Sequence, residues 1–372
     1  MAYLNDENTD INIPMELDLF DEPKNQVAID RIFYSETRPL SNFTSSDAST
    51  VEFFISGQGP EYMDLRRSRL YVRAKIVKGD GSAFDDTDTT SIVNLPLQAM
   101  WSQIDVYMNN KLVSVSTSNY PWKAYLKTIL NSGSDEQKSQ LQSQLFMKDI
   151  GNLASTDGKS GANTGEDGAA YKLELLDCVY KACKIKVDPG ILVNHMKQIE
   201  IKPVRYYFQR TEVKRNTINK SSSEFIWDNL FTIRPSTLVV GLISQDSGNG
   251  SYGTNPFFFN HYNATDVGIY VNGESVPSRP LKLDFGDNRQ YAVAYTNLFE
   301  ACEKLNKDAG LTISREDFGK GYTLHAFQLD PSGLGDDYIN LVKHGNVRLE
   351  MKFSTALPTA VTWFVSGNRQ IT

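Results

Sequence analysis

The sequence predicts an all-β protein with a few inserted helices, arranged as two tandem eight-stranded jelly rolls. Three observations favour this fold class: short strand-like runs dominate from Gln26 onward, turns rich in Gly, Asp and Asn separate them, and several motifs of the first half return in the second. Many short strands with such turns are typical of β-sandwiches and barrels. An immunoglobulin-like sandwich fits less well, because inserted helices and long loops are foreign to it.

The first half combines strand-like runs with two helix-like segments. The first helix is expected over 120–131 and the second over 134–150, where Ser134 and Gln137 make a capping-box pair. The Gly- and Asp-rich stretch 149–170 is predicted to be a surface loop. One apolar face of the second helix is predicted at Leu141, Leu145 and Phe146. The strand-like runs are VAIDRIFY, TVEFFIS, SRLYVRAKIV, SQIDVYM, KLELLDCVYKACKIKV and QIEIKPVRYYF.

The second half repeats this plan. A helix is expected over 291–306, and it follows a predicted hairpin just as 120–131 does in the first half. Its apolar spacing suits one buried helical face, formed by Val293, Leu298, Phe299 and Leu305. The strand-like runs are TLVVGLIS, PFFFNHY, DVGIYV, TLHAFQL, NVRLEMKF and TAVTWFVSG.

The two predicted hairpins suggest an internal duplication. Both carry the pattern apolar-x-apolar-Tyr-apolar-Asn, so Tyr107 corresponds to Tyr270. The turn pairs Asn109-Asn110 and Asn272-Gly273 both accept the positive φ angles of a tight hairpin turn. Further matches follow in order, with offsets that drift because surface loops tolerate changes in length. They pair 66–72 with 234–240, 187–189 with 329–331, 192–195 with 341–344, and 199–202 with 349–352.

These matches divide the chain into a first jelly roll at 26–212, a polar linker at 213–223 and a second jelly roll at 224–372. Residues 1–25 are expected to form a flexible arm, because they hold seven acids against one lysine. Within it, INIPMELDLF alternates apolar and acidic residues, so the arm could dock as an added strand; the other interpretation is an unstructured tail without a partner. The contact residues would be Ile11, Ile13, Met15, Leu17, Leu19 and Phe20.

No catalytic, cofactor-binding or metal site is predicted. Gly158-Lys159-Ser160 resembles the end of a phosphate-binding loop, but Leu153 stands where its first Gly is required. The four histidines include no His-x-His pair of the kind found in double-barrel metalloenzymes. The acidic loop at 84–90 lacks the closing Glu of a calcium loop. Core packing is the expected role of Cys178, Cys183 and Cys302.

Composition narrows the partners and the compartment. A formal net charge of −7 argues against nucleic acid as the main partner, so any DNA contact would be indirect or weak. The sparse cysteines favour a reducing compartment, and no signal peptide or apolar run of about 20 residues is evident. The basic and aromatic segment 202–215 could contact nucleic acid, but a subunit or domain contact is the favoured interpretation. Its basic residues are Lys202, Arg205, Arg210, Lys214 and Arg215.

Several segments, taken in order, resemble a known family. They are RRSRLYV, WSQIDVYMNNKLV followed by YPWKAYLKTIL, WDNLFTIRPSTLVVGL, NPFFFNHYNATDVGIYVNGESVP, FGKGYTLHAFQLD and GNVRLEMKFSTALP. Together they resemble the double jelly-roll, hexon-like major capsid proteins of the Polinton (Maverick) and adintovirus-type double-stranded DNA virus group. The resemblance extends over roughly residues 28–372.

This resemblance implies a structural protein rather than an enzyme. Three subunits, each with two barrels, would form a homotrimer with a nearly hexagonal footprint, and such trimers would tile an icosahedral shell around a double-stranded DNA genome. The implied partners are further copies of the chain, vertex (penton) proteins and minor capsid proteins. The implied location is the virion capsid, after assembly in the nucleus or the cytoplasm of the host cell. The arm would bind the floor of the shell, a neighbouring capsomer or a minor capsid protein.

Two other functions are compatible with part of the sequence. Jelly rolls also serve lectins, so a two-domain β-sandwich protein that binds or processes carbohydrate is the main alternative. The absence of a signal peptide and of paired carboxylates in a cleft counts against it. A minor vertex protein is disfavoured, because vertex subunits usually carry a single barrel.

Overall fold

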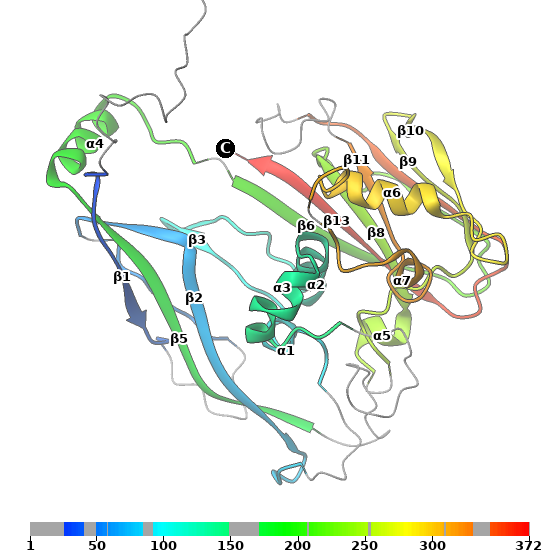
Figure 1. Cartoon of the computed structure of the whole chain (residues 1–372), viewed down its shortest axis with the longest axis horizontal. Coiled ribbons are helices and arrows are strands. Elements are labelled where there is room, and N and C mark those ends of the chain that lie inside the picture. Colours follow the sequence, from blue (N-terminus) through cyan, green and yellow to red (C-terminus); the bar gives the residue numbers. More distant parts are fainter. Residues whose placement is uncertain are drawn as a thin grey trace, which may run out of the picture. The chain divides into compact units, whose positions relative to one another are not determined.

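The computed structural model describes residues 26–40, 50–57, 59–84, 92–148, 171–206, 208–251, 254–308, 310–329 and 343–371. Figure 1 shows the elements in chain order. The strands are β1 (Ile29–Thr37), β2 (Glu61–Lys78), β3 (Tyr107–Met108), β4 (Lys111–Leu112), β5 (Tyr171–Val187), β6 (Phe208–Ile218), β7 (Glu224–Trp227), β8 (Thr237–Ser244), β9 (Ala264–Val271), β10 (Glu274–Lys282), β11 (Leu324–Gln328), β12 (Val347–Phe353) and β13 (Val361–Ile371). The helices are α1 (Pro96–Ala99), α2 (Tyr120–Asn131), α3 (Ser134–Lys138), the 3-10 helix η2 (Gln140–Gln144), α4 (Pro189–Ile201), α5 (Gln245–Asn249), α6 (Ala292–Ala301) and α7 (Arg315–Phe318).

The chain forms two compact units. The first unit comprises Met1–Lys75 and Leu173–Val204, and the second comprises Ile76–Lys172 and Arg205–Thr372. The chain therefore leaves the first unit and returns to it, whereas the sequence predicts one continuous domain at 26–212.

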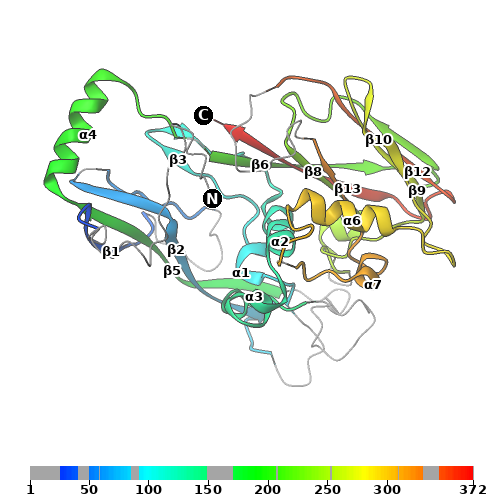
Figure 2. The same ribbon diagram turned by 45° about the horizontal axis from the view of Figure 1, so that its top comes forward.

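The second unit contains a complete jelly roll. Its eight strands form two antiparallel sheets, ordered β6-β13-β8-β11 and β7-β12-β9-β10, so successive strands alternate between the sheets except at the β9-β10 hairpin, as in a jelly roll. The sheets face one another, because the ring of Trp363 in β13 lies 5.5 Å from Trp227 and 5.8 Å from Phe225 in β7. Figure 2 shows the two sheets as separate layers.

A layer of helices covers the other face of the β6-β13-β8-β11 sheet. In α2 the ring of Trp122 stacks 4.7 Å from Phe364 of β13, and Tyr125 stacks 4.2 Å from Phe257. This helix was predicted over 120–131, and the prediction is confirmed. It forms because Pro121 starts it and its buried residues recur at helical spacing. They are Trp122, Tyr125, Leu126, Ile129 and Leu130.

The sheet of the first unit has the order β1-β5-β2. The middle strand β5 pairs antiparallel with β1, with Tyr34 opposite Cys183 and Glu36 opposite Lys181. Because β13 likewise lies between β6 and β8, the topological counterpart of β5 is β13 rather than β11. The match of 187–189 with 329–331 therefore does not reflect equivalent strands.

The predicted hairpins are present in both halves. The turn of β3-β4 has positive φ at Asn109 (47°) and Asn110 (62°), and that of β9-β10 has positive φ at Asn272 (53°) and Gly273 (90°). Both turns therefore have positive φ at both central residues, as the type I′ turn of a two-residue hairpin requires. The pairing of these two segments by sequence is confirmed.

Other predictions need correction. Residues 199–202, expected to be a strand like 349–352, lie largely in α4. Asp188 caps that helix, because its side chain accepts a hydrogen bond from the Gly190 amide, and Pro189 favours the first turn. The expected linker 213–223 overlaps β6, whose full length pairs with β13. The polar residues of this segment suggest a linker, although the segment forms part of a strand.

The remaining helix predictions are partly correct. The helix expected over 134–150 divides into α3 and η2 at Ser139, and Gly133 with Glu136 forms its cap in place of the predicted Ser134 pair. In α6, Leu298 is buried as predicted, but Val293 is exposed and Leu305 lies beyond the helix end. No helix among the described residues is long and apolar enough to cross a membrane.

Candidate functional site

The histidines have structural surroundings rather than a shared site. His325 is fully buried in β11, and within the described structure neither ring nitrogen has a hydrogen-bond partner. Burial, reinforced by nearby His261, lowers the pKa of His325 to about 4. His195 lies on α4 and contacts the Tyr62 hydroxyl at 2.9 Å, whereas His344 makes a β-bridge with Ile233. The described residues contain no group of three or more His, Cys, Asp or Glu side chains suited to a metal ion.

Two of the three cysteines have thiols with a raised pKa. Cys178 and Cys183 are buried in β5, and Cys302 caps the end of α6. Burial raises the pKa of Cys178 to about 11 and that of Cys302 to about 12. Both thiols therefore stay protonated near neutral pH, which makes them poor nucleophiles.

Several predicted features lie outside the described residues. They include Gly158-Lys159-Ser160, the acidic cluster at 85–88, and all six contact residues predicted in the arm: Ile11, Ile13, Met15, Leu17, Leu19 and Phe20.

The basic segment at the end of the first half makes contacts inside the chain. Lys214 donates to the Leu230 carbonyl at 2.7 Å and lies over the Phe231 ring. Arg215 donates to the Gly248 carbonyl at 3.0 Å and lies 5.5 Å from the centroid of the Trp122 ring. These side chains fix β6 inside the second unit, so their contacts lie within one unit, and the subunit or domain contact expected of 202–215 stays a prediction.

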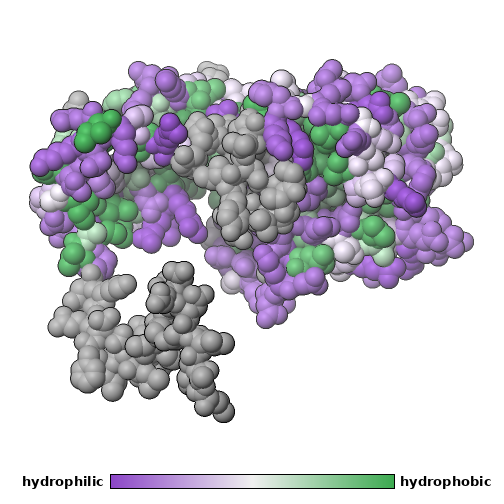
Figure 3. All heavy atoms as spheres, turned by 90° about the horizontal axis from the view of Figure 1, so that it is seen from above, coloured by the Kyte–Doolittle hydropathy of each residue, from purple (hydrophilic) through white to green (hydrophobic). Residues whose placement is uncertain are grey.

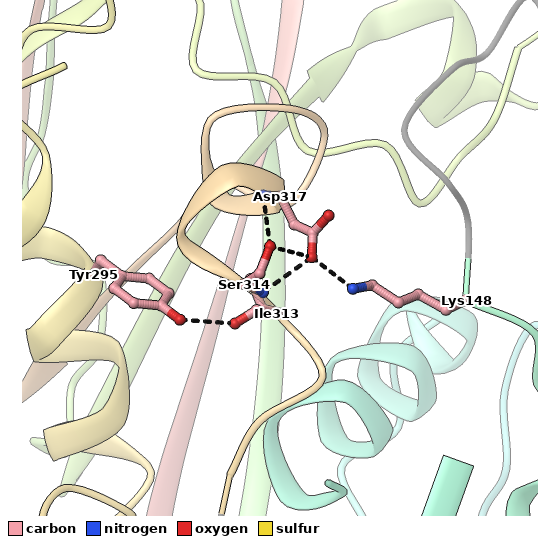
Figure 4. A network of polar contacts seen from close by, with 5 residues as sticks. All are labelled: Lys148, Tyr295, Ile313, Ser314 and Asp317. Carbon is pink, nitrogen blue, oxygen red and sulfur yellow. Dashed lines mark hydrogen bonds and ion pairs between the residues drawn. The ribbon is translucent and has the colours of Figure 1, made fainter. Parts of the chain in front are cut away.

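One polar network ties the chain before residue 149 to helix α7 (Figure 4). The Lys148 ammonium lies 2.5 Å from a carboxylate oxygen of Asp317, which also accepts bonds from the backbone and hydroxyl of Ser314. Burial opposes ionisation of Asp317, but the hydrogen bonds from Lys148 and Ser314 outweigh it and lower the pKa of this carboxyl. The network anchors one end of the stretch 149–170 and is structural in kind.

The first unit exposes apolar side chains. On α4, Val193, Met196 and Ile199 are exposed by 51%, 63% and 55%, and no residue of this helix is buried. In the space-filling view of Figure 3, hydrophobic residues (green) lie among hydrophilic ones (purple) on the visible face. Contiguous exposed apolar residues typically mark an interaction surface.

Strand β2 presents two chemically different faces. Along 67–75 its residues alternate, because successive side chains of a strand point to opposite sides. The basic face of β2 is formed by Arg67, Arg69, Tyr71, Arg73 and Lys75, and its apolar face by Leu70, Val72 and Ala74. All five residues of the basic face are exposed. The alternation is already visible in the sequence as RSRLYVRAK.

Comparison by sequence gives one informative relative. The uncharacterized protein F54H12.2 of Caenorhabditis elegans is 25% identical over 364 residues, covering 82% of this chain and 86% of that protein. No family model matches the sequence.

Comparison by structure is more informative. A chain of the Sputnik virophage has a TM-score of 0.60 at 9% identity, covering 98% of this chain and 90% of that chain. A chain of the PBCV-1 virus capsid has a TM-score of 0.52 at 9% identity, covering 94% and 96%. The fold is a double jelly roll. The predicted all-β class with inserted helices is therefore confirmed, and the double jelly roll of this chain is of the kind found in viral capsid proteins.

Proposed function

We propose that this chain is a major capsid protein. It forms pseudo-hexameric homotrimers, and these tile an icosahedral shell around a double-stranded DNA genome in a virus or element of the Polinton and adintovirus kind. The observation that carries the proposal is the likeness of fold over 98% of this chain and 90% of a virophage chain. The role is one of geometry, so no catalytic step is assigned to any residue.

The exposed apolar surface of the first unit supports this role. In the β1-β5-β2 sheet, Ile32, Leu65 and Leu173 are at least 43% exposed, so this sheet carries apolar surface outside the core of its own unit. Burying such surface is worth roughly 25 cal/mol per Å², so neighbouring subunits gain by covering it. Obligate contacts of capsomers would exceed about 2,000 Å².

The first test is the solution mass of the purified chain at micromolar and nanomolar concentrations. The expected result is a particle near three times 41.8 kDa at both, followed by shells or sheets of trimers in electron micrographs. A monomer at both concentrations contradicts the proposal. If that monomer also binds glycans in an array screen, the carbohydrate-binding alternative replaces it.

Helix α4 offers a sharper test with a matched control. Val193→Lys with Met196→Lys adds two charges to its exposed apolar residues, and we expect loss of trimers or of trimer–trimer association. Asn194→Lys with Gln198→Lys adds the same charge to exposed polar positions of the same helix. Equal assembly by both double variants would remove α4 from the assembly surface.

A further inference from the structure

The β2 edge of the first-unit sheet can accept one more strand. In the order β1-β5-β2, strand β2 is an edge strand, and the described residues supply no ladder partner on its other side. Its counterpart β8, which also lies beside the middle strand of its sheet, has β11 on that side. A free edge presents unpaired N–H and C=O groups that a further strand can satisfy.

The two faces of β2 define what such a strand must look like. On the basic face, Arg67 and Lys75 keep 58% and 51% of their side-chain surface exposed, even though each has one acidic partner. On the apolar face, Leu70 is 41% exposed. A neighbouring strand places its own residues on the same two faces. The fitting partner therefore alternates acidic and apolar residues.

The chain itself contains such a segment. Residues 11–19 read INIPMELDL, in which Glu16 and Asp18 alternate with Met15, Leu17 and Leu19. Paired beside β2, this segment brings carboxylates to the basic face and aliphatic side chains to the apolar face. Pro14 is tolerated there, because the added strand becomes the new edge and one row of its N–H groups faces solvent.

The connection is long enough. Ile29 of β1 pairs with Val187, and an ion pair joins Lys184 to Glu61, so β1 and β2 begin at the same end of the sheet. The nine residues 20–28 span up to about 30 Å when extended. Crossing from the start of β1 to the far side of β2 requires about three strand spacings, or roughly 15 Å. The segment then runs antiparallel to β2.

We propose that residues 11–19 of the chain's own N-terminal arm bind the free edge of β2 as an added antiparallel strand. Glu16 and Asp18 lie against the basic face, and Met15, Leu17 and Leu19 lie over the apolar face. This binding goes beyond the capsid role and does not depend on it, because it concerns one chain in solution.

The main test is amide hydrogen exchange of the full-length chain and of a variant with inverted alternation. The variant carries Met15→Glu, Glu16→Met, Leu17→Asp and Asp18→Leu, so its composition and charge are unchanged. We expect the amides of 66–74 that point to the free edge to exchange at least about tenfold faster in the variant. A control variant carries Leu4→Asp and Asp6→Leu, outside the proposed strand. Its β2 amides should exchange hydrogen at the native rate.

Charge reversal provides an independent test of the proposed added strand. Arg73→Glu should also speed exchange at the β2 edge, and adding Asp18→Lys should restore protection in part. Arg31→Glu, on the opposite edge strand β1, should do neither.

Clear results would overturn the proposal. Unchanged exchange at β2 in the inverted variant means that the arm does not bind there. A response at β1 in place of β2 assigns the wrong edge. If protection depends on protein concentration, the added strand comes from a second copy and not from the same chain. None of these results bears on the trimer mass, so the failure of this inference is distinguishable from failure of the proposed function.

Discussion

The two sheets built on the same strand order differ in how they are buried. In the second unit, β13 lies between β6 and β8 and is buried on both faces, by the facing sheet on one side and by α2 on the other. In the first unit, β5 lies between β1 and β2, yet most residues of β1 and β2 are exposed. Strand order is thus independent of burial. Burial identifies the β6-β13-β8-β11 sheet as part of the core that stabilises the second unit.

The largest expected contrast is between aromatic residues of the two sheets. Trp363→Ala removes a ring that is 1% exposed between the sheets of the second unit, and we expect a loss of about 3–5 kcal/mol in the free energy of unfolding. Tyr71→Ala removes a ring that is 49% exposed on β2, and we expect a change within about 0.5 kcal/mol. Urea unfolding of both variants measures the difference. Equal losses would mean that both sheets contribute alike to the monomer core.

A smaller contrast concerns one equivalent position in β2 and β8. When the match of 66–72 with 234–240 is extended by one residue, Arg73 of β2 becomes the counterpart of Gly241 of β8. A Cβ added at Gly241 would lie 2.5 Å from a carbon of the Phe259 ring, so Gly241→Ala should cost about 1–3 kcal/mol through overpacking. Arg73→Ala should leave the unfolding free energy within about 0.5 kcal/mol. A neutral Gly241→Ala would show that the Phe259 ring moves aside easily.

The features that the sequence predicts correctly are those set by local patterns. The fold class, helix α2 and the two hairpin turns follow from local patterns: the period of apolar residues, Pro121, and the residues that accept positive φ. These features depend on neighbours in the chain, so sequence reasoning finds them. The same pattern search placed 66–72 and 234–240 together correctly, but it assigned no burial to either.

The wrong predictions concern segments whose structure depends on contacts with residues far away in the sequence. Residues 199–202 and 349–352 share a motif, but only the second has strands on both sides to complete its hydrogen bonds. In β6, Lys214 and Arg215 look like linker residues, and their partners, the Leu230 and Gly248 carbonyls, are separated from them in sequence. The proposed binding edge on β2 was missed for a different reason. Its alternation is present in the sequence, but its free edge is a property of the sheet order.

His325 extends the comparison to pH, because it is a histidine of the buried sheet. Its pKa is about 4 in the folded chain, where burial disfavours the charged form, and about 6.5 when unfolded. The unfolded chain therefore binds the proton more readily. This contribution to stability is complete above about pH 6.5 and is lost as pH falls through about 4, with a loss of about 2 kcal/mol between pH 7 and pH 5.

The corresponding experiment uses His325→Leu, which cannot titrate. We expect the urea midpoint of the native chain to fall more steeply between pH 7 and pH 5 than that of the variant. Identical slopes for the native chain and the variant would show that His325 is accessible to protons in the folded state.

The smallest expected effect separates the two hairpin turns. Asn110 has a φ of 62° and Gly273 a φ of 90°, and both stand at the second turn position. Asn-Gly is the most favourable pair for this turn, so Asn110→Gly should make the β3-β4 turn equal to its counterpart and stabilise it by a few tenths of a kcal/mol. Because β3 and β4 have only two residues each, the gain depends on local turn geometry with little help from a sheet. The converse change, Gly273→Asn, should weaken the β9-β10 turn by a similar amount, but β9 is held by β12 over seven residue pairs, so its register should persist. Thermal unfolding of both variants, with exchange of the turn amides, measures the pair. A larger effect at Gly273 than at Asn110 would mean that the sheet amplifies strain at its turns instead of absorbing it.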